Sequence, residues 1–140
     1  MDKIVYTAEA LSTGDGRNGH VRTSDGRLDL DMATPTEMGG SGNGVNPELL
    51  FAAGYSACFH GALRAVAKQQ QVTLQDDAVG ASVHFHTGDD GFHISVDLEV
   101  VIPGMPHDQA MALAEAAHQM CPYSKATRGN VEVQLSVSEG

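Results

Sequence analysis

The sequence predicts an α+β fold, and three observations lead to this prediction. Short segments separated by Asp-Gly turn signals fill the first third of the chain and read as strands. An apolar helix begins at Asn46-Pro47, where Asn caps and Pro suits the first helical position. A hairpin of alternating apolar residues, a second helix and a last alternating strand complete the chain. With 140 residues, we expect one domain over 1–140 with a sizeable core.

The first third is predicted to hold three strands, over 4–11, 19–23 and 28–32. Two Asp-Gly turn signals separate them, and such pairs favour hairpins. Arg17 follows the first turn and is expected to start the second strand. The glycine-rich segment 37–45 lacks the Gly-Lys-Ser/Thr ending of a phosphate-binding loop, which favours a flexible connector.

The helix that begins at Pro47 is predicted to run to about Gln70. It is apolar nearly all round from 49 to 66, and such a helix is expected to be buried. Gly54 and Gly61 each cost a helix about 1 kcal/mol relative to Ala, so we expect close packing against another element at these positions.

The second half is predicted to begin with a hairpin that turns at 87–91. A helix follows over 107–120, with apolar residues at spacings of three and four. Cys121 is expected at or just past the end of this helix, because the residue before a proline avoids the helical conformation. A strictly alternating strand over 131–137 closes the chain.

Charge and hydropathy narrow the classes of partner. The net charge is −10, with only eight Lys and Arg residues, which argues against nucleic acid and anionic membranes. No signal peptide is visible at the start of the sequence. The longest apolar stretch, 49–63, is shorter than the roughly 20 residues of a membrane span. We therefore expect a cytoplasmic protein.

Two cysteines are the main indication of function. In the cytosol a cysteine pair is more often catalytic or metal-binding than a structural disulfide. Cys58 on an apolar helix is, by base rate, a small hydrophobic residue, whereas Cys121 beside Pro122 is expected to be an exposed loop thiol. A reactive thiol needs positive charge nearby. The cations nearest in sequence are Arg64 for the first thiol, and Lys125 and Arg128 for the second.

Other polar residues have structural as well as functional interpretations. His84, His86 and His93 lie on the polar face of the hairpin and could bind a metal together, although a solvated face is favoured. His60 and His118 are expected to be packing or polar partners. Glu48 in a first helical turn suits the helix dipole, and Arg17 beside a turn is compatible with simple surface charge.

Two long motifs and a short one carry a resemblance to a known family. They run from Asn46 to Phe59 (Asn-Pro-Glu-Leu-Leu-Phe-Ala-Ala-Gly-Tyr-Ser-Ala-Cys-Phe), from Cys121 to Asn130 (Cys-Pro-Tyr-Ser-Lys-Ala-Thr-Arg-Gly-Asn) and from Gly16 to Val21. Together they resemble the organic hydroperoxide resistance (Ohr) subgroup of the Ohr/OsmC superfamily. The resemblance covers nearly the whole chain. Leu49 stands where many members carry Gln.

The resemblance implies a thiol peroxidase that needs neither metal nor flavin and that reduces alkyl and lipid hydroperoxides. In it Cys58 matches the peroxidatic cysteine and Cys121 the resolving one. Arg17 matches the arginine that stabilises the thiolate, and Glu48 the carboxylate that orients this arginine. The resemblance also implies an intertwined homodimer in which antiparallel sheets wrap central helices, and dihydrolipoamide or a lipoylated protein as the external reductant.

Two other functions stay open on the sequence: a non-catalytic redox sensor or apolar-ligand-binding protein that uses the same pocket, and a zinc protein that uses Cys and His. The position of Glu48 also stays open. Ten residues of helix separate it from Cys58, a rise of about 15 Å with directions differing by roughly 80°. If Arg17 contacts both, we expect the carboxylate to come from the partner subunit, unless the helix breaks near Gly54.

Overall fold

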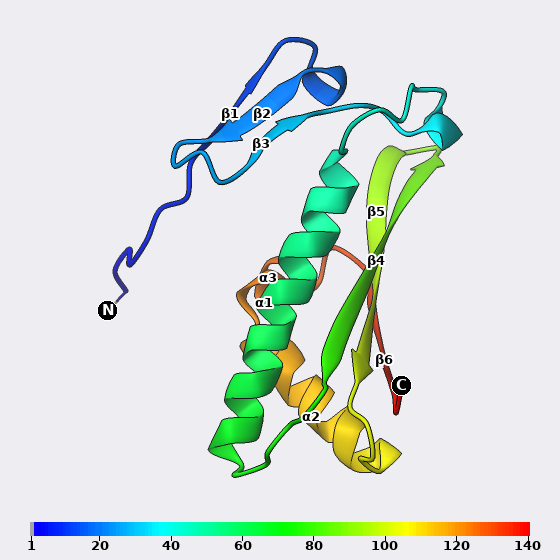
Figure 1. Ribbon diagram of the computed structural model, residues 1–140. Helices are drawn as coiled ribbons and strands as arrows, with labels where there is room; N and C mark the ends of the chain where they lie inside the picture. Colours follow the sequence, from blue (N-terminus) through cyan, green and yellow to red (C-terminus); the bar gives the residue numbers. More distant parts are fainter. Residues whose placement is uncertain (1) are drawn as a thin grey trace. The chain divides into compact units, whose positions relative to one another are not determined.

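The computed structural model describes residues 2–140, and the chain divides into two compact units, Met1–Leu50 and Phe51–Gly140. Helices and strands follow one another in an α+β order, as the sequence predicts (Figure 1). Each unit holds its own three-stranded sheet. The functional residues of the sequence analysis divide between the units, with Arg17 and Glu48 in the first and both cysteines in the second.

The first unit is an antiparallel sheet with two short 3₁₀ turns. Its strands are β1 (Ala10–Thr13), β2 (His20–Thr23) and β3 (Asp29–Asp31), in the order β1-β2-β3. The 3₁₀ turns are η1 (Gly16–Asn18) and η2 (Thr36–Met38). The predicted connector over 37–45 has no strand and no α-helix in it.

Two expectations for this unit are wrong. The first strand begins at Ala10 rather than at residue 4, and Ile4, Val5 and Tyr6 are exposed. A strand needs a neighbour for its backbone groups, and no strand of the described chain pairs with this segment. Arg17 lies in η1 instead of starting β2. Gly14 and Gly16 adopt positive φ angles, 78° and 56°, so the chain makes a tighter turn before the strand.

The long helix α1 spans Pro47–Gln69, close to the predicted range, and is continuous through Gly54. Asn46 caps it, because its side-chain oxygen accepts the backbone N–H of Leu49 at 2.8 Å. By length and composition α1 could cross a membrane, with a mean hydropathy of 1.2, and the core helix of a soluble protein meets the same test.

Only one face of α1 is buried within the chain, although the sequence predicts burial all round. The buried face carries Tyr55, Phe59, Ala62, Leu63, Val66 and Ala67. The opposite face is apolar but exposed, and we call it the α1 outer face; its members lie four residues apart, at Leu49, Ala53, Ala57, Gly61 and Ala65.

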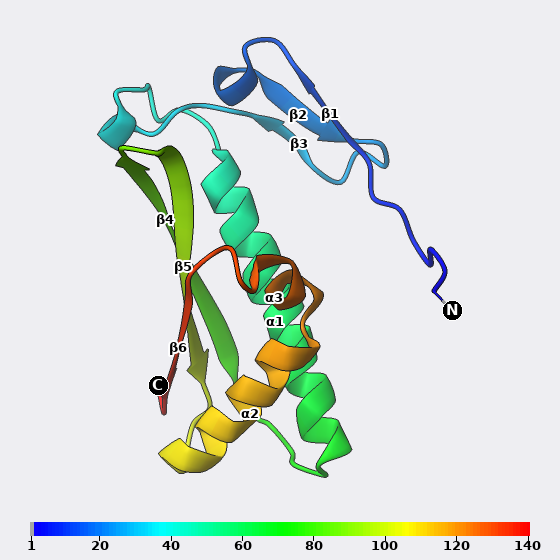
Figure 2. The same ribbon diagram turned by 180° about the vertical axis from the view of Figure 1, so that it is seen from behind.

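The second unit packs α1 and two further helices against a mixed sheet. Strands β4 (Ala78–Gly88) and β5 (Gly91–Val101) form the predicted hairpin, and β6 (Val133–Ser138) lies parallel to β5. Helix α2 covers His107–Met120, as predicted. Figure 2 shows this unit from behind, with β6 at one edge of the sheet. The shared core comes from α1, β5 and α2, including Phe59, Leu98 and Leu113.

A third helix, α3 (Pro122–Thr127), is absent from the sequence prediction. The signal for it is the Cys-Pro pair, because Pro122 occupies the first helical position and Cys121 precedes it as the cap. Cys121 is therefore the corner residue between α2 and α3. Its side chain is buried, with 0 % exposure, so the expected exposed loop thiol is wrong.

Candidate active site

The two cysteines meet although they are distant in sequence. The Sγ atoms of Cys58 and Cys121 lie 3.4 Å apart, and both thiols are free. Cys58 lies on α1 and is half-buried, whereas Cys121 lies behind it, fully buried at the α2–α3 corner. Of the two, Cys58 is the thiol that solvent reaches. An oxidant from outside therefore meets Cys58 first, with Cys121 in contact behind it.

The surroundings within the chain hold Cys58 in the thiol form. Burial raises the pKa of Cys58 above its usual value, because a thiolate loses hydration there. The backbone N–H of Tyr123, in the first turn of α3, lowers the pKa by donating to the sulfur. Cys121 raises the pKa further, since two thiolates in contact repel each other. A positive charge from elsewhere is needed to favour the thiolate.

Aromatic rings lie next to the peroxidatic candidate. The rings of Phe51 and Tyr55 on α1 and Tyr123 on α3 form a triangle, with centroid distances of 5.8 to 6.3 Å. Gly54 makes room for it, because a Cβ at this position would lie 3.2 Å from the Tyr123 hydroxyl and 3.3 Å from its ring. The expected close packing at Gly54 is confirmed, and the partner is Tyr123. The same expectation is wrong for Gly61 within the described chain, because a Cβ there would meet no atom within 4 Å.

Arg17 and Glu48 form a two-point ion pair within the first unit. The two terminal guanidinium nitrogens, Nη1 and Nη2, donate to the two carboxylate oxygens at 3.0 Å. The hydrogen bonds from Arg17 lower the pKa of Glu48, and those to Glu48 raise the pKa of Arg17. The side chain of Arg17 keeps 40 % exposure, against 18 % for Glu48. The carboxylate thus fixes the orientation of the arginine, whose side chain is partly exposed to solvent.

Two other cations named in the sequence analysis are engaged away from the sulfurs. Arg64 pairs with Asp77, whose side chain is fully buried and also bonds His60 at 2.6 Å. Arg128 donates to the backbone carbonyl of His118 at 2.6 Å. Sequence proximity to a cysteine is therefore a poor guide to the charge that acts on it.

A buried polar cluster beside the cysteines was missed in the sequence. The Tyr55 hydroxyl lies 2.8 Å from Ser124 Oγ and 3.1 Å from Thr127 Oγ1, and His118 Nδ1 lies 2.7 Å from Ser124 Oγ. The interpretation of His118 and His60 as polar partners is confirmed. The available signal was the spacing of Cys121, Ser124 and Thr127, which places all three on one face of a helix.

Two of the three histidines of the hairpin meet across the strands. His86 and His93 are opposite each other in the β4–β5 register, and their rings stack at 4.4 Å. His84 bonds Asp97 at 2.9 Å instead. Among the residues that the structure describes, no group of three or more His, Cys, Asp or Glu is arranged to hold a metal ion.

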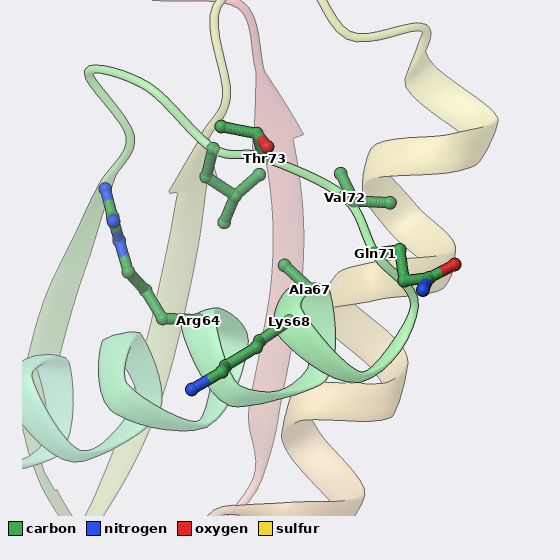
Figure 3. A pocket seen from close by; sticks show the side chains of 7 residues that line it. Arg64, Ala67, Lys68, Gln71, Val72 and Thr73 are labelled. Atoms are coloured by element: carbon green, nitrogen blue, oxygen red, sulfur yellow. The ribbon is translucent and has the colours of Figure 1, made fainter.

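A separate pocket of about 550 Å³ lies at the C-terminal end of α1, and neither cysteine lines it. Figure 3 shows Arg64 and Lys68 on the helix and Gln71, Val72 and Thr73 on the segment that follows.

Fold and site together define an α+β protein with a reduced cysteine pair in contact across two helices. Residues 40–136 match the family described as OsmC-like protein. The chain is 47% identical over 139 residues to the organic hydroperoxide resistance protein of Xanthomonas axonopodis pv. citri, covering 98% of this chain and 97% of that one. It is 45% identical over 134 residues to the organic hydroperoxide resistance protein OhrB of Bacillus subtilis, covering 95% and 98%.

A solved structure gives the same result. The crystal structure of an organic hydroperoxide resistance protein OsmC from Legionella pneumophila is similar with a TM-score of 0.92 and 50% identity, covering 97% of this chain and 99% of that chain. The chain belongs to the OsmC-like protein family and, within it, to the organic hydroperoxide resistance proteins.

Proposed function

We propose that this protein acts in organic hydroperoxide resistance as a cysteine-based peroxidase. The observation that carries the proposal is the 3.4 Å contact between a half-buried Cys58 and a fully buried Cys121. The names of the full-length relatives support the substrate class. The aromatic triangle of Phe51, Tyr55 and Tyr123 supports alkyl and lipid hydroperoxides over hydrogen peroxide, because it is largely apolar.

The first step is nucleophilic attack by the Cys58 thiolate on the terminal oxygen of the hydroperoxide. The O–O bond breaks, the alkoxide leaves and takes a proton to become an alcohol, and Cys58 becomes a sulfenic acid. In the second step the Cys121 thiolate attacks the Cys58 sulfur. The S–S bond forms, the S–O bond breaks, and the leaving hydroxide takes a proton to become water.

An external dithiol closes the cycle by two thiol–disulfide exchanges, and it leaves as its own disulfide. The family resemblance supports dihydrolipoamide or a lipoylated protein in this role. We propose no bound cofactor or metal for any of these steps, because the two sulfurs and the dithiol carry all the electrons.

The charge that favours the Cys58 thiolate is assigned to Arg17, oriented by Glu48. Both lie in one chain as a two-point pair, and α1 is continuous between Glu48 and Cys58, a rise of about 15 Å. We therefore assign each Arg17–Glu48 pair to the Cys58 of a partner subunit. The active unit in this proposal is a homodimer.

Two exposed apolar surfaces support the homodimer. The α1 outer face is lined by small residues, and its Leu49 is 54 % exposed. The segment with Ile4, Val5 and Tyr6 lacks a strand partner in the described chain, although its pattern predicts a strand. A second subunit can cover both. The acidic charge supports a protein with no nucleic-acid or membrane partner. A cytoplasmic location is part of the same proposal.

A steady-state assay tests the function. Purified protein with cumene hydroperoxide and excess dihydrolipoamide is expected to consume many equivalents of hydroperoxide, and thioredoxin is expected to support turnover far less well. Consumption of a single equivalent per chain would identify a redox sensor instead. Equal rates with thioredoxin would leave the peroxidase activity in place but would remove the assignment of dihydrolipoamide or a lipoylated protein as the reductant.

A further inference from the structure

Four polar side chains on α1, α2 and α3 form one hydrogen-bond chain. Tyr55, Ser124 and Thr127 are all buried, and His118, which is half-buried, stands at one end of the hydrogen-bond chain. The contacts run from His118 Nδ1 to Ser124 Oγ at 2.7 Å, from Ser124 Oγ to the Tyr55 hydroxyl at 2.8 Å, and from that hydroxyl to Thr127 Oγ1 at 3.1 Å. The steps proposed above use none of these hydroxyl and imidazole groups.

The direction of this hydrogen-bond chain follows from where the Thr127 hydrogen goes. A hydroxyl has one hydrogen to donate. Thr127 Oγ1 lies 3.2 Å from the backbone carbonyl of Ser124, and we assign its hydrogen to this carbonyl as the stronger acceptor, so Thr127 accepts from Tyr55. Tyr55 has then used its own hydrogen and accepts from Ser124. Ser124 in turn accepts from His118, which must carry its proton on Nδ1.

Three members of this hydrogen-bond chain lie three residues from one of the cysteines in sequence. His118 and Ser124 lie three residues before and three residues after Cys121, so their bond closes the α2–α3 corner at which this cysteine lies. Tyr55 lies three residues before Cys58, on the same side of α1. The bonds from Tyr55 to Ser124 and Thr127 therefore join the helix of one cysteine to the corner that holds the other.

We propose that this one-directional hydrogen-bond chain, headed by the Nδ1–H form of His118, makes Tyr55, Ser124 and His118 positioning residues that hold Cys121 against Cys58. The proposal rests on the function proposed above for its biological meaning, since it concerns the step in which Cys121 resolves the oxidised Cys58. The proposal assigns these hydrogen bonds no part in the first attack on hydroperoxide.

The test follows both sulfurs without any hydroperoxide. Cys58 attacks dipyridyl disulfide, its S–S bond breaks, and one pyridine thiol leaves as a mixed disulfide forms on Cys58. Cys121 then attacks the Cys58 sulfur and expels the second pyridine thiol. Absorbance of the released thiol resolves the two phases, and the second phase measures positioning of Cys121. A failed peroxidase assay would therefore leave this measurement intact, and the two proposals fail separately.

Tyr55→Phe, Ser124→Ala and His118→Leu are expected to slow the second phase by about tenfold or more, because each leaves a buried group unpaired. In Ser124→Ala and His118→Leu the first phase should stay within about twofold of wild type, since these changes leave the Cys58 side chain in place. His118→Asn should restore the second phase, because its side-chain amide supplies an N–H at the position of Nδ1. Ser56→Ala is the matched control, since it removes a hydroxyl that donates to the Ala53 carbonyl of the same helix.

Wild-type resolution rates in all three variants would overturn the proposal. A spectroscopic measurement on the wild-type protein keeps it falsifiable if the variants fail to fold. Nitrogen-15 NMR of the His118 ring, at a pH where the ring is neutral, should show the proton on Nδ1. Burial, and then the charge of Arg128, lower the pKa of His118, so mildly alkaline buffer suffices. A proton on Nε2 would contradict the direction of the chain and with it the proposal.

Discussion

The Sγ atoms of Cys58 and Cys121 lie 3.4 Å apart across 63 residues of sequence. A disulfide bond is about 2.0 Å long, so the two sulfurs are in contact but not bonded, and a small movement joins them. Helix α1 and the α2–α3 corner, which carry the sulfurs, are tied together by buried hydrogen bonds from Tyr55. The pair is therefore held close in the reduced state, as a resolving step requires.

Cys58→Ser is expected to abolish hydroperoxide reduction, by at least about a thousandfold, because a serine alkoxide is scarcely present at neutral pH. The dihydrolipoamide-coupled rate measures this. Cys121→Ser serves as the comparison, since it should keep the first attack. Substantial turnover by Cys58→Ser would remove this residue from the role assigned to it.

Arg17→Ala is expected to move the alkylation profile of Cys58 to higher pH, by about one unit or more, because an opposite charge near the thiolate is lost. Burial raises the pKa of Cys58 within the chain, and Arg17 is assigned the opposite effect. The rate of modification by iodoacetamide, measured across pH on the Cys121→Ser background, reports the titration. An unchanged profile would place Arg17 away from the thiolate.

Mixed dimers test whether the Arg17–Glu48 pair serves the partner subunit. Cys58→Ser and Glu48→Ala homodimers should each be weakly active or inactive. In a mixed dimer the intact Cys58 of the Glu48→Ala chain meets the intact Glu48 of the other chain, so activity should return in one of two sites. Heterodimers isolated with two different affinity tags give the rate. Confirmed heterodimers without rescue would assign the pair to its own chain.

Asp77 is expected to make the free energy of unfolding fall as the pH is lowered. Burial alone would raise its pKa, but the hydrogen bonds from Arg64 and His60 outweigh burial and hold it below its usual value. A carboxylate with a depressed pKa stabilises the fold above its unfolded pKa, and this contribution is lost as pH falls through the folded pKa. Asp77→Asn should thus be less stable at neutral pH, with a smaller further loss on acidification.

Urea unfolding at neutral pH and near pH 3 measures both quantities for wild type and variant. Asp25, which is exposed and bonded by Thr23 and the N–H of Arg27, offers the matched control Asp25→Asn. An equal fall of stability in wild type and Asp77→Asn would show that this buried carboxylate does not govern the acid response.

Much of the fold could be predicted because local patterns carry it. The cap at Asn46, the alternation of β4 and β5, and the periodicity of α2 each specify their own element. The first strand was predicted too early, since its apolar residues lack a neighbour within the chain. Helix α3 was missed because its six residues are too few to show a helical period, although Pro122 marks its first position.

The site was predictable in composition but not in geometry. The family motifs identify Cys58, Cys121, Arg17 and Glu48 as candidates. No local pattern shows that Cys121 is buried or that Arg17 bonds Glu48 of its own chain. The cluster of Tyr55, Ser124 and His118 depends on contacts between helices far apart in sequence. Such contacts follow from packing, which the sequence specifies only through the whole fold.

Mass spectrometry after one equivalent of cumene hydroperoxide, without reductant, tests the central claim that Cys58 is oxidised and Cys121 resolves it. Wild-type protein should lose two hydrogens as the Cys58–Cys121 disulfide forms. Cys121→Ser should instead gain one oxygen on Cys58, as a sulfenic acid that a second equivalent converts to sulfinic acid. Unmodified Cys58 in the Cys121→Ser protein, or wild-type protein without the disulfide, would contradict the account.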